Sequence, residues 1–389
     1  MKSAENASGD LNTIPNPHLV PAYSVLQEAI ASMAFPGCSF GVFASGSVIL
    51  QDALGHFTYD EGARPVTPET VFDVASITKV VSTTTTAMLL HQRGQLDLET
   101  PLGDLLPGFI VGRPSVEHAR SVTLRHLLAH NSGLPGYVPL YQTATSPAAL
   151  FRALLQLPVE TPPGTRMEYS DPGFILLGKA LEVLTREYLA RWAEQEIFQP
   201  LALRDTCFCP PLEIRHQIPP TEEDTTFRRR HIQGEVQDEH AWLLHGAAGH
   251  AGLFSNVPDL LRFAGAILSS TRPSSQSANP PLFTQQSIET FAQRQAPSGS
   301  SRALGWDTPS ADSSAGTFFS QHSIGHLGYS GCSLWIDLDA GIAVALLTNR
   351  TWPNRSSQLI RQVRPAFHNA VRRALTLLGH QRLQPHQTP

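Results

Sequence analysis

Two residues that could do chemistry together, Ser76 and Lys79, stand three positions apart in the stretch VFDVASITKVVSTTTTAMLLHQ, residues 71–92. We expect this stretch to be helical, and positions i and i+3 of a helix share a face, so the hydroxyl and the amine can meet. A serine at a helix N-terminus also lies near unpaired backbone N–H groups, which favour an oxyanion. The pair is therefore a candidate nucleophile with an activating amine. Alone, it could equally be a capping serine and a solvated lysine.

A second group of candidates, Tyr169-Ser170-Asp171, stands in an expected connection between two amphipathic helices. An ammonium favours a neighbouring phenolate, so Tyr169 beside Lys79 is expected to ionise below its usual pKa of about 10. The phenolate could then act as the general base for Ser76. If Asp171 faces Lys79, its charge raises the lysine pKa and Lys79 stays an ammonium. The alternative, with Lys79 itself as the base, stays open.

The third group, His326-Leu327-Gly328-Tyr329, comes just before an expected hairpin of two β-prone segments. A His-x-Gly sequence carries little information by itself. Ser-x-x-Lys, Tyr-x-Asp and His-x-Gly in this order, at a helix start, a turn and a strand, carry much more.

With these three groups, the chain resembles the β-lactamase-related serine hydrolases, which include class C β-lactamases, D-alanyl-D-alanine peptidases and family VIII carboxylesterases. In that family, Ser-x-x-Lys carries the nucleophile, Tyr-x-Asn supplies a phenol for the serine proton, and Lys-Thr-Gly forms the opposite wall of the cleft. The resemblance covers roughly residues 18–378. Further segments that resemble family members are VTLRHLLAHNSGLPG (122–136), VQDEHAWLLHGAAGHAGLFS (236–255) and GHLGYSGCSLWIDLDAGIAVALLTNR (325–350).

The resemblance implies a site and its parts. Ser76, Lys79 and Tyr169 would be catalytic, and the backbone N–H groups of Ser76 and Tyr329 would form the oxyanion hole. The substrate would be a small ester or a peptide-like molecule, and no cofactor is implied. Substrate contacts would come from the remaining matched positions, Asp171, His326, Leu327 and Gly328.

Three departures from the family pattern bear on the substrate. Asp171 stands where class C enzymes carry asparagine, and His326 and Leu327 replace the lysine and threonine of Lys-Thr-Gly. The strand thereby loses a positive charge and a hydroxyl, and the turn gains a carboxylate, so an anionic substrate should bind poorly. We therefore expect a carboxylesterase-like activity on neutral acyl esters. The alternatives are a D-alanyl-D-alanine carboxypeptidase or β-lactamase, and a non-catalytic binding module.

Asp238, His240, His245 and His250 are of residue types that bind zinc. Their spacing lacks a His-x-x-x-His pair, and the family resemblance explains this segment as cleft lining, so no metal ion is expected. The chain also has no G-x-S-x-G sequence, which argues against an ordinary α/β-hydrolase.

The fold that these elements suggest is α+β: an antiparallel sheet formed from both chain termini, flanked by helices, with an inserted, mostly helical lobe. We expect a disordered tail at 1–17, one domain at 18–378 and a tail at 379–389. Within the domain, the α/β lobe would comprise about 18–75 and 300–378, and the helical lobe about 76–299. The periodicity predicts helices at 19–33, from Ser76 to near Gly94, and at 123–130, 147–157, 173–187, 258–268 and 356–378. It predicts strands at 38–44, 48–54, 331–337 and 342–348, and loops at 96–109 and 271–281.

Composition excludes some classes of function. The net charge of −5 and the pI near 6.3 give no electrostatic case for nucleic acid. We expect no membrane span, and the start of the chain lacks the apolar core of a signal peptide. The four cysteines are expected to be reduced and the protein cytoplasmic, or periplasmic if translation starts elsewhere. The sequence does not determine the oligomeric state.

Overall fold

The computed structural model describes residues 16–113, 115–271 and 281–379. Most of the two expected tails and most of the expected loop at 271–281 lie outside these residues. Among the described residues, no helix combines the length and the apolarity that a membrane span requires. All four cysteines are free thiols.

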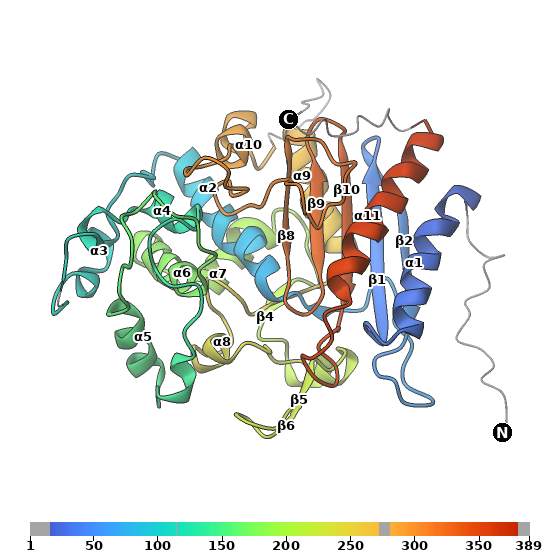
Figure 1. The fold of residues 1–389 in the computed structure, drawn as a ribbon, viewed down its shortest axis with the longest axis horizontal. Coiled ribbons are helices and arrows are strands. Elements are labelled where there is room, and N and C mark those ends of the chain that lie inside the picture. The colour runs from blue at the N-terminus through green and yellow to red at the C-terminus, as the bar shows by residue number, and fades with distance from the viewer. Residues whose placement is uncertain (1–15, 114, 272–280, 380–389) are drawn as a thin grey trace.

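A five-stranded antiparallel sheet runs through the molecule, with the strand order β2-β1-β10-β9-β8 (Figure 1). Its centre joins the two ends of the chain, because β1 pairs with β10 from Cys38 opposite Thr348 to Ala44 opposite Ile342. The predicted α+β class, with a sheet drawn from both termini, is confirmed. The strands are β1 (Gly37–Ala44), β2 (Ser47–Gly55), β8 (Ser323–Leu327), β9 (Ser333–Asp337) and β10 (Ile342–Thr348).

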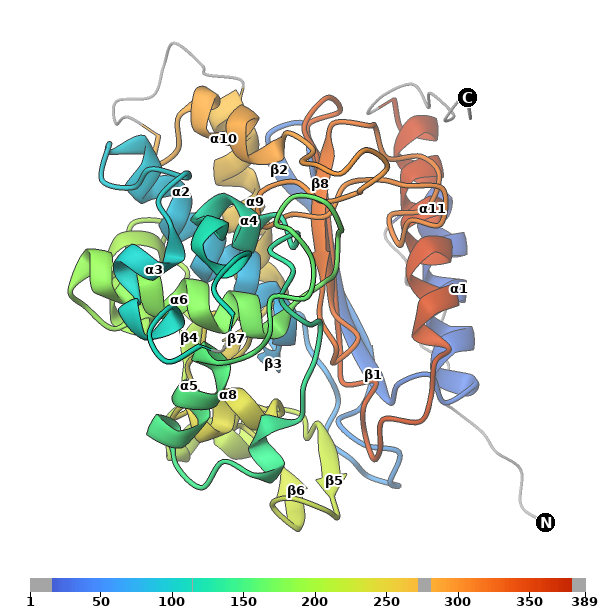
Figure 2. The ribbon, with the colours of Figure 1, turned by 60° about the vertical axis from the view of Figure 1, so that its left-hand side comes forward.

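The two faces of this sheet are buried in different cores, because side chains alternate along each strand. Phe40 and Val344 face α1 (Val20–Ala31) and α11 (Ile360–Leu377), which lie together on one side of the sheet (Figure 2). Ala343, Ala345 and Leu347, on the opposite face of β10, belong to the other core, which includes α9 (Val257–Thr271) and the helical part of the chain.

The helical part lies on the side of the sheet opposite α1 and α11 (Figure 2). Its helices are α2 (Thr85–Gln92), α3 (Leu102–Leu105), α4 (Leu124–Leu128), α5 (Pro147–Leu155), α6 (Asp171–Thr185), α7 (Leu189–Ala193), α8 (Glu239–Leu243) and α10 (Gln285–Ala292). A small sheet, β3 (Phe72–Asp73), β7 (Leu253–Ser255) and β4 (Cys207–Phe208), and a ribbon, β5 (Glu222–Asp224) and β6 (Arg230–Ile232), complete the strands. The division into two lobes stays a prediction.

The helix expected from Ser76 to near Gly94 is not a regular α-helix. It begins as a 3₁₀ turn, η3 (Ala75–Ile77), continues as a π-helix, η4 (Lys79–Thr84), and only then becomes α2. Its run of threonines explains the irregularity, since their hydroxyls bond to nearby carbonyls, as when Thr85 Oγ1 donates to Val80 O at 2.8 Å.

The expected loop at 96–109 also contains regular structure, namely α3 and a 3₁₀ turn. Leu102 and Phe109 are fully buried, so packing stabilises turns that are too short to leave a periodic pattern in the sequence. The remaining short turns are η2 (Pro17–Leu19), η5 (Pro107–Phe109), η6 (Ala119–Ser121), η7 (Leu140–Gln142), η8 (Glu194–Phe198) and η9 (Leu212–Gln217).

Candidate active site

Ser76 lies in the turn η3, directly after the short strand β3. The carboxylate of Asp73 holds this turn, because its Oδ1 accepts the Ala75 N–H at 2.8 Å and its Oδ2 accepts the Gln237 N–H at 2.7 Å. Burial raises the pKa of Asp73 to about 6, although both N–H groups lower it. Ala75 has a φ of 48°, a left-handed conformation that is strained for a residue with a side chain. A strained and clamped backbone therefore precedes the candidate nucleophile.

Lys79 is fully buried, and its Nζ donates to Ser76 Oγ at 2.8 Å and to Asp171 Oδ1 at 2.7 Å. The same Nζ donates to the carbonyl oxygen of His250 at 3.1 Å. Burial lowers the pKa of Lys79, but its interactions with Asp171 and Tyr169 outweigh burial, and the pKa lies above its ordinary value. Lys79 is therefore an ammonium that donates to the serine oxygen.

Asp171 is the first residue of α6, which begins there and not at the predicted residue 173. The preceding Ser170 caps the helix, since its Oγ accepts the Gly173 N–H at 3.0 Å. A carboxylate in the first turn of a helix is stabilised by the positive end of the helix dipole. The capped start of α6 thus presents Asp171 to Lys79.

Tyr169 lies between the two walls of the site. Its ring packs on His130, with centroids 4.5 Å apart, and Lys79 Nζ lies 4.9 Å from the ring centre. Burial raises the pKa of Tyr169, and hydrogen bonding to Lys79 and Ser76 lowers it by less. The prediction of a lowered tyrosine pKa is therefore wrong, because burial dominates and Asp171 already balances the lysine charge.

The opposite wall is formed by the end of β8, where His326 is almost fully buried. The ring Nδ1 of His326 bonds to the carbonyl oxygen of Leu327 at 2.8 Å, so Nδ1 carries the proton. Burial lowers the pKa of His326 well below its usual range, and the charges of Arg302 and Lys79 lower it further. This wall therefore offers a neutral imidazole and an apolar side chain.

Gly328 allows β8 to approach the nucleophile segment, because a Cβ at this position would lie 2.4 Å from the carbonyl oxygen of Val74. The chain turns there with hydrogen bonds from Gly328 N–H to Cys332 O at 2.7 Å and from Gly331 N–H to Gly328 O at 3.0 Å. The Tyr329 N–H takes part in neither bond. The glycine thus meets the protein's own backbone, a contact that sequence analysis did not anticipate.

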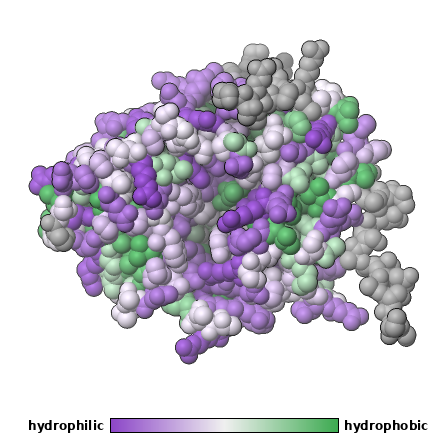
Figure 3. All heavy atoms as spheres, viewed as in Figure 1, coloured by the Kyte–Doolittle hydropathy of each residue, from purple (hydrophilic) through white to green (hydrophobic). Residues whose placement is uncertain are grey.

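A cleft of about 630 Å³ opens between the two walls. In the face shown in Figure 3, hydrophilic side chains gather near the centre, between the helical part and the sheet. Lys79 is buried behind the cleft lining. The predicted residues that line the cleft are Ser76, Tyr169, Asp171, His326, Leu327, Gly328 and Tyr329.

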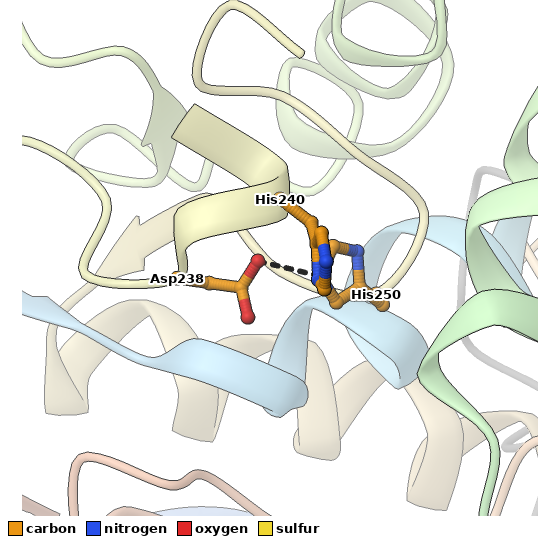
Figure 4. Close-up of side chains that lie close together, drawn as sticks. All are labelled: Asp238, His240 and His250. Carbon is orange, nitrogen blue, oxygen red and sulfur yellow. Dashed lines mark hydrogen bonds and ion pairs between the residues drawn. The ribbon is translucent and has the colours of Figure 1, made fainter. Parts of the chain in front are cut away.

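Asp238, which lines the cleft, lies close to His240 and His250 (Figure 4). Asp238 caps α8 by accepting the Ala241 N–H at 2.8 Å, and its Oδ1 lies 2.7 Å from His250 Nε2. His250 lowers the pKa of Asp238 despite burial, which keeps the carboxylate ionised. The three side chains offer metal-ligand atoms within 4.8 Å of one another, whereas His245 is not part of this group. The expectation that no metal binds here stays a prediction.

Three residues of the site were not singled out in the sequence. Asp73 had a local signal, since an aspartate two residues before a turn often accepts its N–H groups. His130 ends the segment TLRHLLAH, within one of the stretches that resemble the family. Arg302 reaches the cleft from the loop between α10 and β8 and had no local signal.

The geometry defines a serine hydrolase site, and comparisons with known proteins agree. A family model described as Beta-lactamase matches residues 24–365, and the chain therefore belongs to this family. The predicted family and the predicted hydrolytic enzyme class are confirmed.

Among the relatives that align over most of the chain are two enzymes with different names. The chain is 30% identical over 362 residues to the N-acetylmuramyl-L-alanine amidase of Bacillus subtilis, covering 84% of this chain and 79% of that protein. It is 28% identical over 347 residues to a putative D-alanyl-D-alanine carboxypeptidase of Salmonella typhimurium, covering 81% and 79%. The structure of EstCE1, described as a hydrolase with promiscuous acyltransferase activity, superposes with a TM-score of 0.71 at 23% identity, covering 90% of this chain and 98% of EstCE1. That last likeness concerns the fold alone.

Proposed function

We propose that this hydrolase cleaves an ester or amide bond through an acyl-enzyme on Ser76. The observation that carries the proposal is the 2.8 Å hydrogen bond from Lys79 Nζ to Ser76 Oγ beside the cleft. Ser76 Oγ attacks the substrate carbonyl carbon, its proton leaves, and the amine or alcohol departs with a proton. Water then attacks the acyl-enzyme and releases the acid.

Tyr169 accepts the serine proton in this scheme. Lys79 is already an ammonium, so it cannot accept the proton, and its hydrogen bond stabilises the developing serine alkoxide. Tyr169 acts from its small phenolate population and later returns the proton to the leaving group. Asp171 keeps Lys79 charged. Because the groups titrate together, mutants are needed to assign the base.

The oxyanion hole in this scheme is formed by the backbone N–H groups of Ser76 and Tyr329. Both residues line the cleft, Ser76 within the turn η3 and Tyr329 two residues after the end of β8. The close approach that Gly328 permits supports this pairing. Two donors aimed at one oxygen would stabilise the tetrahedral intermediate.

Two arguments from the sequence favoured neutral acyl esters as substrates, and one of the two still applies. The neutral His326 and the apolar Leu327 still favour them. The other support was repulsion of anions by Asp171, but this carboxylate is paired with Lys79 at 2.7 Å and its charge is balanced.

Peptidoglycan-type peptides, cleaved at an amide bond, are our first candidate for the substrate. The two relatives described above bear the names of enzymes that cleave such bonds. The cleft of about 630 Å³ also falls within the range that encloses drug-sized ligands, well above the size of a short ester. Neutral acyl esters are the second candidate.

A fluorophosphonate probe followed by a substrate panel tests these proposals. We expect the probe to label Ser76, which a non-catalytic binding module would not permit. The panel comprises N-acetylmuramyl-L-alanine, a D-Ala-D-Ala peptide, nitrocefin and p-nitrophenyl acetate and butyrate, with each kcat/KM divided by the uncatalysed rate. An amide should rank highest; if an ester ranks highest, the second candidate replaces the first. A cytoplasmic location stays a prediction that fractionation can test.

A further inference from the structure

Arg302 occupies a fixed position in the same cleft. The segment that carries it is attached to β8, because Asp307 N–H donates to Gly325 O at 2.8 Å and Gly325 N–H donates back at 2.9 Å. Arg302 N–H is held by Ser300 Oγ at 3.0 Å. The guanidinium carbon lies 5.1 Å from the centre of the Tyr169 ring. Arg302 is therefore held against the residue that we assign as the proton acceptor.

The side-chain donors of Arg302 have no hydrogen-bond acceptor among the described residues. Its Nε is buried and unbonded, although the side chain as a whole is 16% exposed. Arg302 Nε forms an ion pair with Asp307 Oδ1 at 3.8 Å, which is beyond hydrogen-bond distance, and that oxygen already accepts from Ser301 Oγ at 2.7 Å. An arginine that is mostly enclosed normally uses its donors, so this one is suited to an acceptor that enters the cleft.

Most other arginines of the cleft are engaged by the protein. Arg350 donates to the carbonyl oxygens of Tyr329 and Ser357, and Arg364 donates to three carbonyl oxygens around the β8 turn. Arg355 bonds to two glutamates, Glu222 and Glu239. Arg361 is exposed. Arg302 alone, among the cleft arginines of the described residues, is both enclosed and without an acceptor.

The charge balance points the same way. The ammonium of Lys79 is matched by Asp171, and the strand position that carries lysine in the resembling motif carries the neutral His326. The guanidinium of Arg302, whose ion-pair partner Asp307 lies 3.8 Å away, places a positive charge beside this wall from a different segment. A planar guanidinium suits a carboxylate, which it can bind through two parallel hydrogen bonds.

We propose that Arg302 binds a carboxylate of the substrate and sets the preference of the enzyme for anionic over neutral molecules. This inference rests on the proposed function and deepens it by giving the substrate a charge. It also reverses the expectation that anionic substrates bind poorly, which considered only the residues of the motifs.

The test compares substrates that differ in one carboxylate. One pair is a D-Ala-D-Ala peptide and the same peptide with a C-terminal amide, which probes the leaving-group side. The other is p-nitrophenyl hydrogen glutarate and p-nitrophenyl butyrate, which probes the acyl side. For each pair, kcat/KM of the acid is divided by kcat/KM of the neutral molecule. In Arg302→Gln this ratio should fall about ten- to a hundredfold for one of the two pairs, because that is the usual effect of losing a charge-assisted hydrogen bond. Arg302→Lys should restore part of that ratio.

Arg361→Gln is the matched control, since it removes an exposed arginine from the same cleft, and it should leave both ratios within about threefold of wild type. If Arg302→Gln leaves both ratios unchanged, or lowers acid and neutral substrates equally, the assignment is overturned. If fluorophosphonate does not label the wild type and no substrate turns over, the proposed acyl-enzyme fails instead. In that case, the Kd values of the acid peptide and of its amide are measured with the Ser76→Ala variant, with and without Arg302→Gln. The acid peptide should bind more tightly than its amide only while Arg302 is present. Equal Kd values in the variant that keeps Arg302 would overturn the inference.

Discussion

The two walls of the cleft are built on different physical terms. On the nucleophile wall, Ser76, Lys79 and Asp171 are joined by hydrogen bonds of 2.7 to 2.8 Å that involve full charges. On the β8 wall, His326 and Leu327 present no charge, and the nearby guanidinium comes from another segment. The comparison teaches that the reaction is encoded in compact motifs, whereas recognition depends on groups that the motifs do not contain.

Removing the nucleophile should have the largest effect. Ser76→Ala is expected to reduce turnover more than about a thousandfold, because the acyl-enzyme can no longer form. The measurement is hydrolysis of the best panel substrate together with fluorophosphonate labelling. Ser82→Ala is a matched control, since the buried Ser82 hydroxyl has no hydrogen-bond partner in the described part of the chain. A Ser76→Ala variant that keeps more than a thousandth of the wild-type rate would contradict the scheme.

Removing the phenol of Tyr169 should have the next largest effect on the reaction rate. Tyr169→Phe is expected to slow acylation by about 10²–10⁴, the usual range for a positioned general base. Pre-steady-state release of p-nitrophenol measures this step directly. Tyr137→Phe is a suitable control, because Tyr137 also lines the cleft and is 52% exposed. A nearly silent Tyr169→Phe beside an inactive Lys79→Ala would make the lysine the base.

The pH dependence sharpens the comparison further. The pKa values of Tyr169 and Lys79 both lie above their ordinary values, so the basic form of either group becomes more populated as pH rises. We expect kcat/KM to increase with a slope near one in log units between about pH 7 and 9, below the tyrosine pKa. Asp171→Asn removes a charge that raises both pKa values, so the increase should occur at lower pH. Superposable wild-type and Asp171→Asn profiles would show that Asp171 does not tune the site.

A substitution on the β8 wall should have the smallest effect on kcat/KM. Leu327→Thr places a hydroxyl where the resembling strand motif has one, and we expect the acid-to-neutral ratio of kcat/KM to rise by less than about tenfold, as one neutral hydrogen bond permits. Leu327→Val is the matched control, with the shape of threonine and no hydroxyl. If Leu327→Thr raises this ratio by a larger factor than Arg302→Gln lowers it, β8 and not Arg302 dominates recognition.

The sequence predicted the features that depend on residues close together in the chain. Ser76 and Lys79 are three residues apart, and the hairpins β1–β2 and β9–β10 are each formed by two β-prone segments that follow each other in the chain. The predicted lowering of the Tyr169 pKa failed because burial and the pairing of Lys79 with Asp171 appear only in three dimensions. Arg302 was missed for a related reason, since its place in the cleft depends on the bonds between Asp307 and Gly325 and not on any local pattern.

The pairing of β1 with β10 governs when the newly made protein can become active. Cys38 lies opposite Thr348, about 300 residues later in the chain, so the first hairpin leaves the ribosome long before its partner exists. Until then β1 is an open edge, and apolar side chains such as Phe40 lack the α11 surface that covers them. Closing so long a loop is slow, and chaperones therefore have most opportunity to bind during this interval. The nucleophile segment is synthesised early, but it gains its opposing wall only after the last strands have been made.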